Sequence, residues 1–417
     1  MRILQVAQFY PPVPGGAELH VQSLAHGLAS RGHDVEVVTL HEGSIPADER
    51  DGPVRVHRVR GWLQRIPGLH TPGIPRAAAP FPDPAVAASL MQVMRGHRPE
   101  VIHAHNWLGY SALPPLAVRR LPLVESLHNY GRVCAKQTLM RDGQVCSGPG
   151  ITKCPPCAAR HYGTARGLAT TGALWAMGGW HDASVDHYLA VSQSVADRNG
   201  LAAVNRPYSV VPNFVPDELG EARPAKPIAL PAALPDGPFL LFVGAISRVK
   251  GIDVLFDAYR RLHAPLPLVV IGFRAPDTDD LVASAPPGVQ VHLDWPHGAV
   301  MEAWRRCIVG ICPSIWPEPC PTVVIEAMTA GVPLIGARSG GIPELLDDGR
   351  AGRIVAPGNA AELSAAMAAL IADPDERARL SDAARRRSEI YLASAVIPQI
   401  ESVYRTLIRR NGGGTEA

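Results

Sequence analysis

Residues 318–326 read Glu-Pro-Cys-Pro-Thr-Val-Val-Ile-Glu, and this stretch decides both the fold and the site. An apolar run at 309–312 precedes it and predicts a buried strand, while 323–329 predicts a helix. Glu318 is therefore expected in a strand-to-helix loop, and Glu326 about one turn into the helix. Free N–H groups at the helix start can hold a diphosphate, with a carboxylate on each side to bind hydroxyl groups. A sugar nucleotide has this shape, although a helix-terminus charge and a solvated glutamate would give the same spacing.

A second strand-to-helix loop carries two cations. Residues 244–251 follow a predicted buried strand at 239–243 and precede a helical pattern that starts at Ile252. Arg248 and Lys250 are therefore expected at the carboxyl edge of a parallel sheet, where α/β folds bind ligands. Lysine is scarce in this chain, which favours a functional lysine in this loop over an ordinary solvated charge.

The C-terminal half resembles glycosyltransferase family 4, the retaining glycosyltransferases with a GT-B fold. The resemblance is carried by the segments 242–253, 313–314, 318–333, 340–344 and 352–358. It implies that Arg248 and Lys250 hold the donor diphosphate and that Glu318 contacts the donor sugar. It further implies that Glu326 contacts the ribose of the donor.

Two departures from the family pattern concern the donor site. Backbone amides at Thr322 and Val323 are expected to bind the diphosphate, but the family usually has Gly-Phe-Gly where this chain has Pro-Cys-Pro at 319–321. Pro321 fits the first helical turn and has no N–H, so the set of amides that hold the phosphates stays open. The family also usually has Gly at Asp294, beside the expected base pocket, which leaves the donor base open.

Composition restricts the class of protein. The chain has 417 residues, of which 47% are hydrophobic and 19% charged, and this is enough apolar material for two domains. The net charge of +2 argues against nucleic acid as a partner. No apolar run reaches the length of a membrane span, and a strand starts at the N-terminus, so no signal peptide is expected. We expect a cytoplasmic protein with reduced thiols, either free or at the inner face of the membrane.

Short apolar strands alternate with helical patterns in both halves, which predicts an α/β protein of two Rossmann-like parallel-sheet domains. The strands predicted in the first half are 2–7, 35–39, 54–59, 101–105, 123–126, 188–192 and 209–212. Those predicted in the second half are 239–243, 268–271, 290–293, 309–312, 333–336 and 352–355. The predicted parts are an acceptor-side domain 1–216, a linker 217–237, a nucleotide-sugar domain 238–390 and a final helix 391–417. By the resemblance, this GT-B pair faces across a cleft and the final helix returns to the first domain.

The first predicted strand leads into Gly-Gly-Ala-Glu at 15–18. Two glycines let a ligand approach the backbone closely, and the helix that opens there can face an anion, while an ordinary flexible turn is the alternative. The Gly-x-Gly-x-x-Gly pattern of dinucleotide sites is absent here. Family 4 members carry Gly-Gly-Ala-Glu at this position, where the loop reaches the donor phosphates and borders the acceptor site. The resemblance therefore assigns Gly15 and Gly16 to donor binding and, with less support, Glu18.

His128 follows the strand predicted at 123–126 and is expected at the carboxyl edge of the first sheet. A single histidine is more often structural than catalytic, but the resemblance implies that His128 contacts the transferred sugar. The family usually has His-Asp at this position, and Asn129 stands in place of the Asp. An acidic role at that position therefore stays open.

A predicted insertion at 131–160 contains a cluster of cysteines: Cys134, Cys146, Cys154 and Cys157. Four thiolates suit a structural zinc ion, and an iron–sulfur cluster takes the same ligands. The segment is rich in Gly, Pro and polar residues, so it lacks an apolar core and a metal would help it fold. Some family members carry a similar insertion. The alternatives are a redox dithiol and unrelated thiols.

These features predict a retaining glycosyltransferase that moves a hexose-type sugar from a nucleoside-diphosphate sugar to an acceptor hydroxyl. The acceptor is expected to be a saccharide, a lipid-linked molecule or a small molecule, in glycan, glycolipid or natural-product glycoside biosynthesis. The residues expected to act in catalysis are His128, Arg248, Lys250 and Glu318. The cations would stabilise the leaving diphosphate, so no cofactor is expected in the chemistry.

The alternatives are a GT-B nucleotide-sugar epimerase, a phosphorylase-type enzyme and a nucleotide-sugar-binding regulatory subunit with a metal module. The long segment 61–84 contains Pro and Arg. It is expected either to help form an acceptor or peripheral membrane site or to be a mobile loop.

Overall fold

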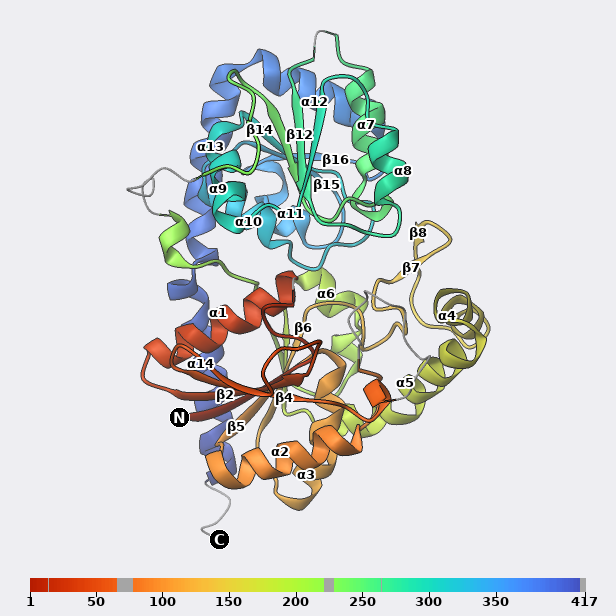
Figure 1. The fold of residues 1–417 in the computed structure, drawn as a ribbon, viewed down its shortest axis with the longest axis vertical. Helices are drawn as coiled ribbons and strands as arrows, with labels where there is room; N and C mark the ends of the chain where they lie inside the picture. Colours follow the sequence, from red (N-terminus) through yellow and green to blue (C-terminus); the bar gives the residue numbers. More distant parts are fainter. Residues whose placement is uncertain (14, 66–77, 221–228, 264, 413–417) are drawn as a thin grey trace. The chain divides into compact units, whose positions relative to one another are not determined.

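The computed structural model describes residues 1–13, 15–65, 78–220, 229–263 and 265–412, and it divides into two compact units (Figure 1). The first unit contains residues 1–139, 147–212 and the C-terminal segment from Ala393. The second unit contains residues 213–392 and the short segment 140–146. The predicted boundary between the domains at 216 lies close to the observed division after Pro212.

The first unit is built on a mostly parallel sheet with the strand order β10-β9-β6-β5-β1-β2-β4-β3 among the described residues. Its strands are β1 (Arg2–Ala7), β2 (Asp34–Leu40), β3 (Asp48–Asp51), β4 (Val54–Val59), β5 (Val101–His105), β6 (Leu123–Leu127), β9 (His187–Ala190) and β10 (Tyr208–Val210). β5 and β6 are buried along their whole length, as expected for parallel strands covered on both faces. β3 pairs antiparallel with β4 at the edge. The sequence did not predict β3, because its residues Asp-Glu-Arg-Asp lack an apolar pattern.

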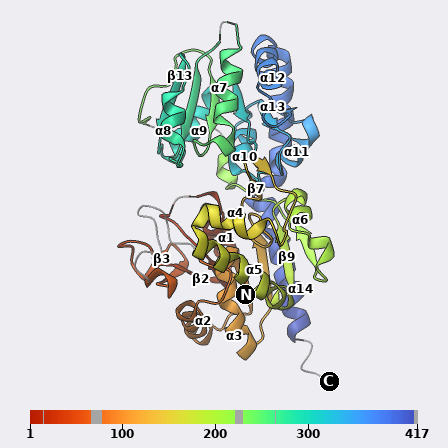
Figure 2. The ribbon, with the colours of Figure 1, turned by 90° about the vertical axis from the view of Figure 1, so that its right-hand side faces the viewer.

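Helices cover both faces of this sheet (Figure 1, Figure 2). The helices of the first unit are α1 (Gly16–Ser30), α2 (Pro84–His97), α3 (Leu113–Val118), α4 (Cys154–Tyr162), α5 (Thr164–Ser184), α6 (Gln193–Arg198) and α14 (Ala393–Gly412), with the short 3-10 helices η1 (Leu63–Arg65), η2 (Asn106–Ala112) and η3 (Leu201–Ala203). The C-terminal helix α14 packs on α1, where the Arg31 guanidinium lies 2.8 Å from the Glu401 carboxylate. The final helix therefore belongs to the first unit, although residues 213–392 of the second unit lie between it and the rest of the first unit in the sequence.

The second unit has a fully parallel sheet with the strand order β13-β12-β11-β14-β15-β16. Its strands are β11 (Leu240–Val243), β12 (Leu268–Gly272), β13 (Val289–Leu293), β14 (Val309–Cys312), β15 (Leu334–Ala337) and β16 (Arg353–Val355). Its helices are α7 (Ile252–Arg260), α8 (Thr278–Ala283), α9 (His297–Arg306), α10 (Thr322–Thr329), α11 (Ile342–Leu345), α12 (Ala360–Ala372) and α13 (Pro374–Ser388), with the 3-10 helices η4 (Asp217–Gly220), η5 (Arg248–Lys250), η6 (Asp347–Gly349) and η7 (Glu389–Tyr391). Leu255 and Phe256 of α7 and Met367 of α12 bury their side chains against this sheet.

Both sheets have a switch point, where the strand order reverses between neighbouring strands. In the first unit it lies between β1 and β5, and in the second unit it lies between β11 and β14. Ligands of open α/β sheets bind outside the carboxyl ends of the strands at such points. The predicted α/β fold of two Rossmann-like sheets is confirmed, and it directs attention to the loops after these four strands. Among the described helices, none is both long and apolar enough to cross a bilayer.

Candidate functional site

The switch point of the second unit brings two predicted site residues into contact. Lys250 follows β11, Glu318 follows β14, and the Lys250 Nζ lies 2.6 Å from the Glu318 Oε1. The Glu318 side chain is buried, and the Ser314 hydroxyl also donates to its Oε1 at 2.5 Å. The Lys250 ammonium lies 5.1 Å from the centre of the Trp316 ring, a cation–π distance. The sequence predicted that Lys250 and Glu318 belong to the site. It did not predict that Ser314 would contact Glu318 or that Trp316 would contact Lys250.

Two glycines set the close packing of these loops. Gly251 has a φ of 77°, and a Cβ there would lie 2.2 Å from the Pro313 carbonyl oxygen. Gly340 has a φ of 59°, and a Cβ there would lie 2.0 Å from the Glu318 carbonyl oxygen. Both positions combine a left-handed backbone with no room for a side chain, so only glycine fits without strain. The glycines therefore fix the positions of the Lys250 and Glu318 backbones.

Arg248 lies in the same loop but has a different environment. Its guanidinium is about half exposed and lies 3.8 Å from the Asp253 carboxylate, while its backbone N–H donates to Asp277 Oδ2 at 2.7 Å. The backbone is therefore held while the side chain stays accessible to an anion. An exposed ion pair at this distance contributes little to stability, so Arg248 is well suited to exchange Asp253 for a ligand phosphate.

Helix α10 starts beside Glu318, as predicted. Its N-cap residue is Pro321, which has an extended backbone, and no side chain of the described residues caps the helix. The amides of Thr322 and Val323 stand in the first turn, where backbone N–H groups have no partner within the helix. The preceding carbonyl, that of Cys320, accepts a hydrogen bond of 2.8 Å from the Asn213 side chain. The start of α10 therefore presents polar N–H groups next to the Lys250–Glu318 pair.

Glu326 has a partner that sequence reasoning missed. The His297 Nε2 at the start of α9 lies 3.1 Å from the Glu326 Oε1. This hydrogen bond raises the pKa of His297, and burial acts in the opposite direction. The contact joins residues far apart in the chain, so no local pattern announces it. Glu326 is buried but keeps this polar partner, which orients its carboxylate.

Asp294, which replaces the Gly usual in the family, has a left-handed backbone with a φ of 55°. Glycine adopts that conformation freely, and Asp is among the few other residues that tolerate it. In this chain the position therefore favours glycine, and Asp294 is one of the few other residues that fit there. Asp294 is exposed at the end of β13.

In the first unit, the predicted glycine loop follows β1 and opens α1. Gly15 is the N-cap residue of α1, and Gly16 is the first residue of that helix. A Cβ on Gly15 would lie 1.9 Å from the Glu18 Oε2, so the Glu18 side chain folds back over the helix start. Burial raises the pKa of Glu18. Glu18 thus occupies the helix start where the sequence predicted an anion.

His128 lies at the carboxyl end of β6 in a row of buried imidazoles. The His128 Nε2 lies 2.9 Å from the His105 Nδ1 of β5, and the His128 and His20 rings are 4.9 Å apart. The next ring, His103, lies between the Tyr404 hydroxyl at 2.5 Å and the Ser126 hydroxyl at 2.8 Å. We refer to His20, His103, His105 and His128 as the histidine row. Sequence reasoning singled out only one member of it, although His-Ala-His at 103–105 places two rings on one face of a strand.

Burial keeps most of the histidine row neutral. It lowers the pKa of His103 to about 3, and it lowers the pKa values of His20 and His105 well below the usual range. The neighbouring imidazoles add to each of these shifts, because a second positive charge beside the first is unfavourable. A neutral His105 can donate or accept one hydrogen bond at Nδ1, and so it orients the ring of His128.

Asn129 has a structural role in place of the acidic residue usual in the family. Its side-chain amide donates to the Gln137 Oε1 at 3.0 Å, and its carbonyl oxygen accepts from the Gly131 N–H at 2.8 Å. An aspartate could accept the second bond but not donate the first. Asn129 therefore ties the loop after His128 together, and this chain has no carboxylate at that position.

The predicted metal site in the insertion has no support in the structure. No group of three or more His, Cys, Asp or Glu residues in the described chain is placed to hold a metal ion, and none of the cysteines there forms a disulfide. Cys134, Cys154 and Cys157 lie in the first unit, whereas Cys146 is in the short segment that belongs to the second. The end of the insertion forms α4, which packs tightly on the following helix α5 at Gly167, a contact that the sequence did not predict. Metal binding therefore stays a prediction.

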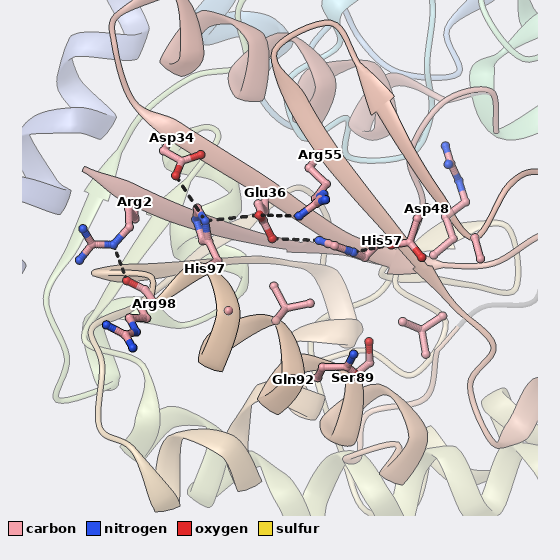
Figure 3. Close-up of a pocket in the computed structure, with 15 residues that line it drawn as sticks. Arg2, Asp34, Glu36, Asp48, Arg55, His57, Ser89, Gln92, His97 and Arg98 are labelled. Atoms are coloured by element: carbon pink, nitrogen blue, oxygen red, sulfur yellow. Dashed lines mark hydrogen bonds and ion pairs between the residues drawn. The ribbon is translucent and has the colours of Figure 1, made fainter.

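A polar hollow of about 1010 Å³ lies elsewhere in the first unit, between the sheet and α2 (Figure 3). The His57 ring reaches carboxylates on both sides, at 2.6 Å from Asp48 and 2.9 Å from Glu36. His97 lies 3.5 Å from the same Glu36, and Figure 3 shows this network lining the hollow. The hollow borders the amino ends of β1 and β2, so it is separate from the predicted site residues at the carboxyl ends. The predicted acceptor or membrane segment 61–84 lies in part, at 66–77, outside the described residues.

Both halves of this chain are similar in sequence to known protein families. Residues 14–219 match the family described as Glycosyltransferase Family 4, and residues 231–387 match the family described as Glycosyl transferases group 1. A glycogen synthase of Mycobacterium tuberculosis is 28% identical over 93% of this chain and 90% of its own length. A D-inositol 3-phosphate glycosyltransferase of Streptomyces coelicolor is 28% identical over 95% of this chain and 88% of its own length.

Solved structures share the fold. A sucrose-phosphate synthase from Thermosynechococcus elongatus superposes with a TM-score of 0.75 at 20% identity, covering 98% of this chain and 100% of that chain. The HepE protein of Anabaena, in complex with UDP and glucose, superposes with a TM-score of 0.69 at 19% identity, with the same coverage of 98% and 100%. These likenesses extend over both units of the chain.

Proposed function

Because this chain belongs to the nucleotide-sugar-dependent glycosyltransferases of the family 4, GT-B type, we propose that it transfers a hexose-type sugar to an acceptor hydroxyl with retention at the anomeric carbon. The observation that carries the proposal is the Lys250–Glu318 pair at the switch point, next to the start of α10. A cation for phosphate, a carboxylate for hydroxyl groups and free amides stand together there. These groups match the chemistry of a sugar diphosphate.

The contacts of Glu318 allow it to bind the sugar while Lys250 binds the diphosphate. Glu318 accepts hydrogen bonds from both Lys250 and Ser314 at the same oxygen, so Oε2 has capacity for a sugar hydroxyl. The ammonium of Lys250 has three N–H groups and uses one of them on Glu318. Its remaining donors can bind phosphate without breaking the pair. Arg248, with its accessible guanidinium, adds a second cation.

In the proposed reaction, the bond between the anomeric carbon and the diphosphate oxygen breaks, and the acceptor oxygen bonds to the anomeric carbon on the same face. The acceptor proton passes to an oxygen of the leaving diphosphate, so no side chain acts as a covalent nucleophile. Negative charge grows on the diphosphate as the first bond breaks. Lys250, Arg248 and the α10 amides stabilise that charge, which is electrostatic catalysis.

His128 is proposed to hydrogen-bond the transferred sugar, and Glu326 the ribose. His128 lies at the carboxyl end of β6, beside the switch point of its own sheet. His105 holds the ring of His128 at 2.9 Å, which limits its rotation. Gly15 and Gly16 are proposed to border the donor phosphates. The Glu18 side chain, which covers this helix start, is proposed either to move aside when the donor binds or to contact the acceptor. A buried and oriented hydrogen-bonding row suits recognition of sugar hydroxyl groups.

The acceptor is proposed to be a saccharide or a polyol-type small molecule. The relatives named above are a synthase of a polysaccharide and a transferase named for an inositol phosphate, and both acceptor classes present hydroxyl groups. A lipid-linked acceptor is the further candidate from the sequence. The location of the protein in the cytoplasm stays a prediction.

Mass spectrometry of products, with NMR to assign their anomeric configuration, would test the function. The purified chain is incubated with a panel of nucleotide sugars, with and without saccharide and polyol acceptors. A new glycoside with the anomeric configuration of the donor, formed only with acceptor, supports the proposal. Release of epimerised or free sugar without any acceptor would instead indicate an epimerase-type enzyme. Donor binding by calorimetry without turnover of any donor would indicate a regulatory subunit.

A further inference from the structure

Three side-chain amides form a cluster beside His128 that the proposed reaction does not use. They belong to Asn106, which directly follows β5, to Asn129, which directly follows His128, and to Gln137. The Asn129 Nδ2 donates to the Asn106 Oδ1 at 3.3 Å and to the Gln137 Oε1 at 3.0 Å. Asn106 and Asn129 follow the carboxyl ends of β5 and β6, and β5 borders the switch point of its sheet. This amide cluster therefore lies where open α/β sheets bind ligands.

The backbone fixes the direction of each amide in the cluster. The Gly131 N–H donates to the Asn129 Oδ1 at 2.8 Å, and because a backbone N–H can only donate, this atom must be the oxygen of the Asn129 side chain. The Asn129 nitrogen is therefore the donor, and the atoms that face it must be the oxygens of Asn106 and Gln137. The NH2 groups of Asn106 and Gln137 are consequently turned away from Asn129, and within the described residues neither has a hydrogen-bond partner.

The surrounding contacts hold the amide cluster in place. Gly131 has no room for a Cβ, which would lie 2.9 Å from the Asn129 Oδ1. The Asn129 carbonyl oxygen accepts a hydrogen bond of 3.1 Å from the Asn199 side chain. Asn106 and Gln137 have left-handed backbones with φ values of 64° and 62°, a conformation that costs free energy in residues other than glycine. The chain thus holds two strained residues in fixed positions with donor groups unused, and such strain is typical of a ligand site.

The unused groups of the amide cluster define the ligand that fits them. Both are uncharged NH2 groups, which only donate hydrogen bonds, so the ligand must present an oxygen that accepts them. A sugar hydroxyl both donates and accepts, so it would bind to donors and to acceptors equally well. A carbonyl-type oxygen only accepts, so it distinguishes between the two. In sugars, such oxygens belong to a carboxylate or an acetamido group, whereas a doubly charged phosphate is bound mainly by cations.

We propose that the amide cluster is an acceptor subsite that selects sugars bearing a carboxylate or an acetamido group. This role rests on the proposed function, in which His128, next to Asn129, contacts the transferred sugar. Asn129 sets the selection, because an aspartate there would accept from Gly131 but could donate to neither amide. Asn106 and Gln137 would then turn their NH2 groups toward position 129 and present their oxygens to the ligand. The substitution would thus reverse the cluster from donor to acceptor, and its charge would repel a carboxylate.

Binding of acceptor analogues to the full-length protein tests the proposal. The probes are methyl glycosides of the gluco and galacto series, each as the plain sugar, the uronate and the N-acetylamino sugar, with Kd measured by saturation-transfer NMR. We expect the uronate or the N-acetylamino sugar to bind about fivefold or more tightly than the plain sugar, and the two arms show which group is selected. Asn129→Asp should lower that preference about tenfold or more, and so reverse it, with the Kd of the plain sugar unchanged within about twofold. Gln137→Met, which removes one donor without adding charge, should weaken the preference about threefold without reversing it.

Asn205→Asp is the matched control, because it makes the same charge change at an exposed position of the same unit, before β10 and so at the amino ends of the strands. It should keep the parent's preference, and an equal loss of preference there would overturn the proposal. Equal binding of all three sugars by the parent, binding of none, or an unchanged preference in Asn129→Asp would overturn it as well. If melting curves show that Asn129→Asp does not fold, the effect of Gln137→Met decides.

The product assay separates the subsite from the proposed function. Transfer of sugar without any preference among the three acceptors contradicts the subsite alone. The binding preference and its reversal in Asn129→Asp, without transfer to any acceptor, support the subsite and contradict the proposed function alone.

Discussion

The two switch points differ in the kind of group that each provides. In the second unit, the loops after β11 and β14 carry charged side chains, and Lys250 and Glu318 form a close ion pair there. In the first unit, the ends of β5 and β6 carry the histidine row, which burial keeps largely uncharged. The same sheet architecture thus supports one site suited to an anion and another suited to uncharged hydroxyl groups. Reaction and pH experiments can separate these two roles.

The largest effect is expected for Lys250→Ala. Losing a cation that meets the charge of the departing diphosphate should lower kcat about a hundredfold or more. The structure adds a cost in stability, because the buried Glu318 carboxylate would keep only Ser314 as a partner. An incompletely satisfied buried group costs about 1–3 kcal/mol. Steady-state kinetics and chemical denaturation would measure the two losses separately.

Arg248→Ala is the companion variant, since its exposed guanidinium contributes little to stability. It should lose rate without loss of stability, and Arg260→Ala, a similarly exposed arginine on α7, should lose neither. The double variant Lys250→Ala/Glu318→Gln should recover stability but not rate. If Lys250→Ala kept nearly the parent turnover while folded, the placement of the diphosphate in the second unit would be wrong.

The second prediction concerns acid. The pKa of His103 is lowered to about 3, and those of His20 and His105 are lowered as well, from an unfolded value of about 6.5. Below that value the unfolded chain binds more protons than the folded one. The contribution of these histidines to the free energy of unfolding is therefore complete above about pH 6.5. Below that pH, each histidine that binds a proton only on unfolding lowers the free energy of unfolding by about 1.4 kcal/mol per pH unit. The protection of the amides in β5 and β6, corrected for the intrinsic exchange rate at each pH, should fall as the pH falls from 7 to 5.

A matched comparison assigns this acid sensitivity to the histidine row. His103→Asn replaces a buried titratable ring with a neutral polar side chain that can still bond Tyr404 or Ser126. Its stability at neutral pH should be lower than that of the parent, but its loss of stability between pH 7 and 5 should be smaller. An unchanged slope in that range would show that other groups cause the acid sensitivity.

The third prediction tests His105 as a positioning residue for His128. His105→Phe keeps a ring but removes the 2.9 Å hydrogen bond. A net hydrogen bond is worth about 1 kcal/mol, which corresponds to about a fivefold loss in kcat, with the donor KM nearly unchanged. His105→Gln, which can still bond His128, should recover much of the rate. If both variants lost the same fraction of kcat, and this loss followed the fall in their melting temperatures, the role of His105 would be structural only. Equal losses by His105→Phe in the parent and in a His128→Ala background would also contradict the role.

The sequence predicted most of the strands and the residues at their carboxyl ends, for a physical reason. Strands of a parallel sheet are buried on both faces, so they read as short apolar runs, and the loop after each run is visible as a change in composition. The donor loops could therefore be placed from local patterns alone. The charged edge strand β3 lacks that signal. The hairpin β7 (Met140–Arg141) and β8 (Gln144–Val145) was also missed, although its Asp142-Gly143 turn is a recognised hairpin signal.

Other features of the site could not be read from the sequence because they depend on contacts between distant segments. His103 contacts Tyr404, which lies 301 residues later in the chain, and His297 of α9 contacts Glu326 of α10. The sequence analysis treated Arg248 and Lys250 as equivalent cations. In the structure they differ, because only Lys250 contacts a buried carboxylate. Local periodicity locates loops, but it carries no information on which side chains of different loops meet.

The smallest effect is expected for His297, whose pH dependence has the opposite sign to that of the histidine row. Its hydrogen bond to Glu326 raises the pKa of His297 in the folded state, so its stabilising effect is complete below about pH 6.5 and is lost as the pH rises through the folded value. The ring is half exposed, which limits the contribution of the pair to about 1 kcal/mol or less. His297→Gln should therefore lower the stability of the second unit at pH 6 and leave it unchanged at pH 9. Amide exchange in α9 and α10 would measure this. A variant that destabilises these helices equally at both pH values would show that His297 acts through packing, and Glu326 would then lack the charged partner that orients it.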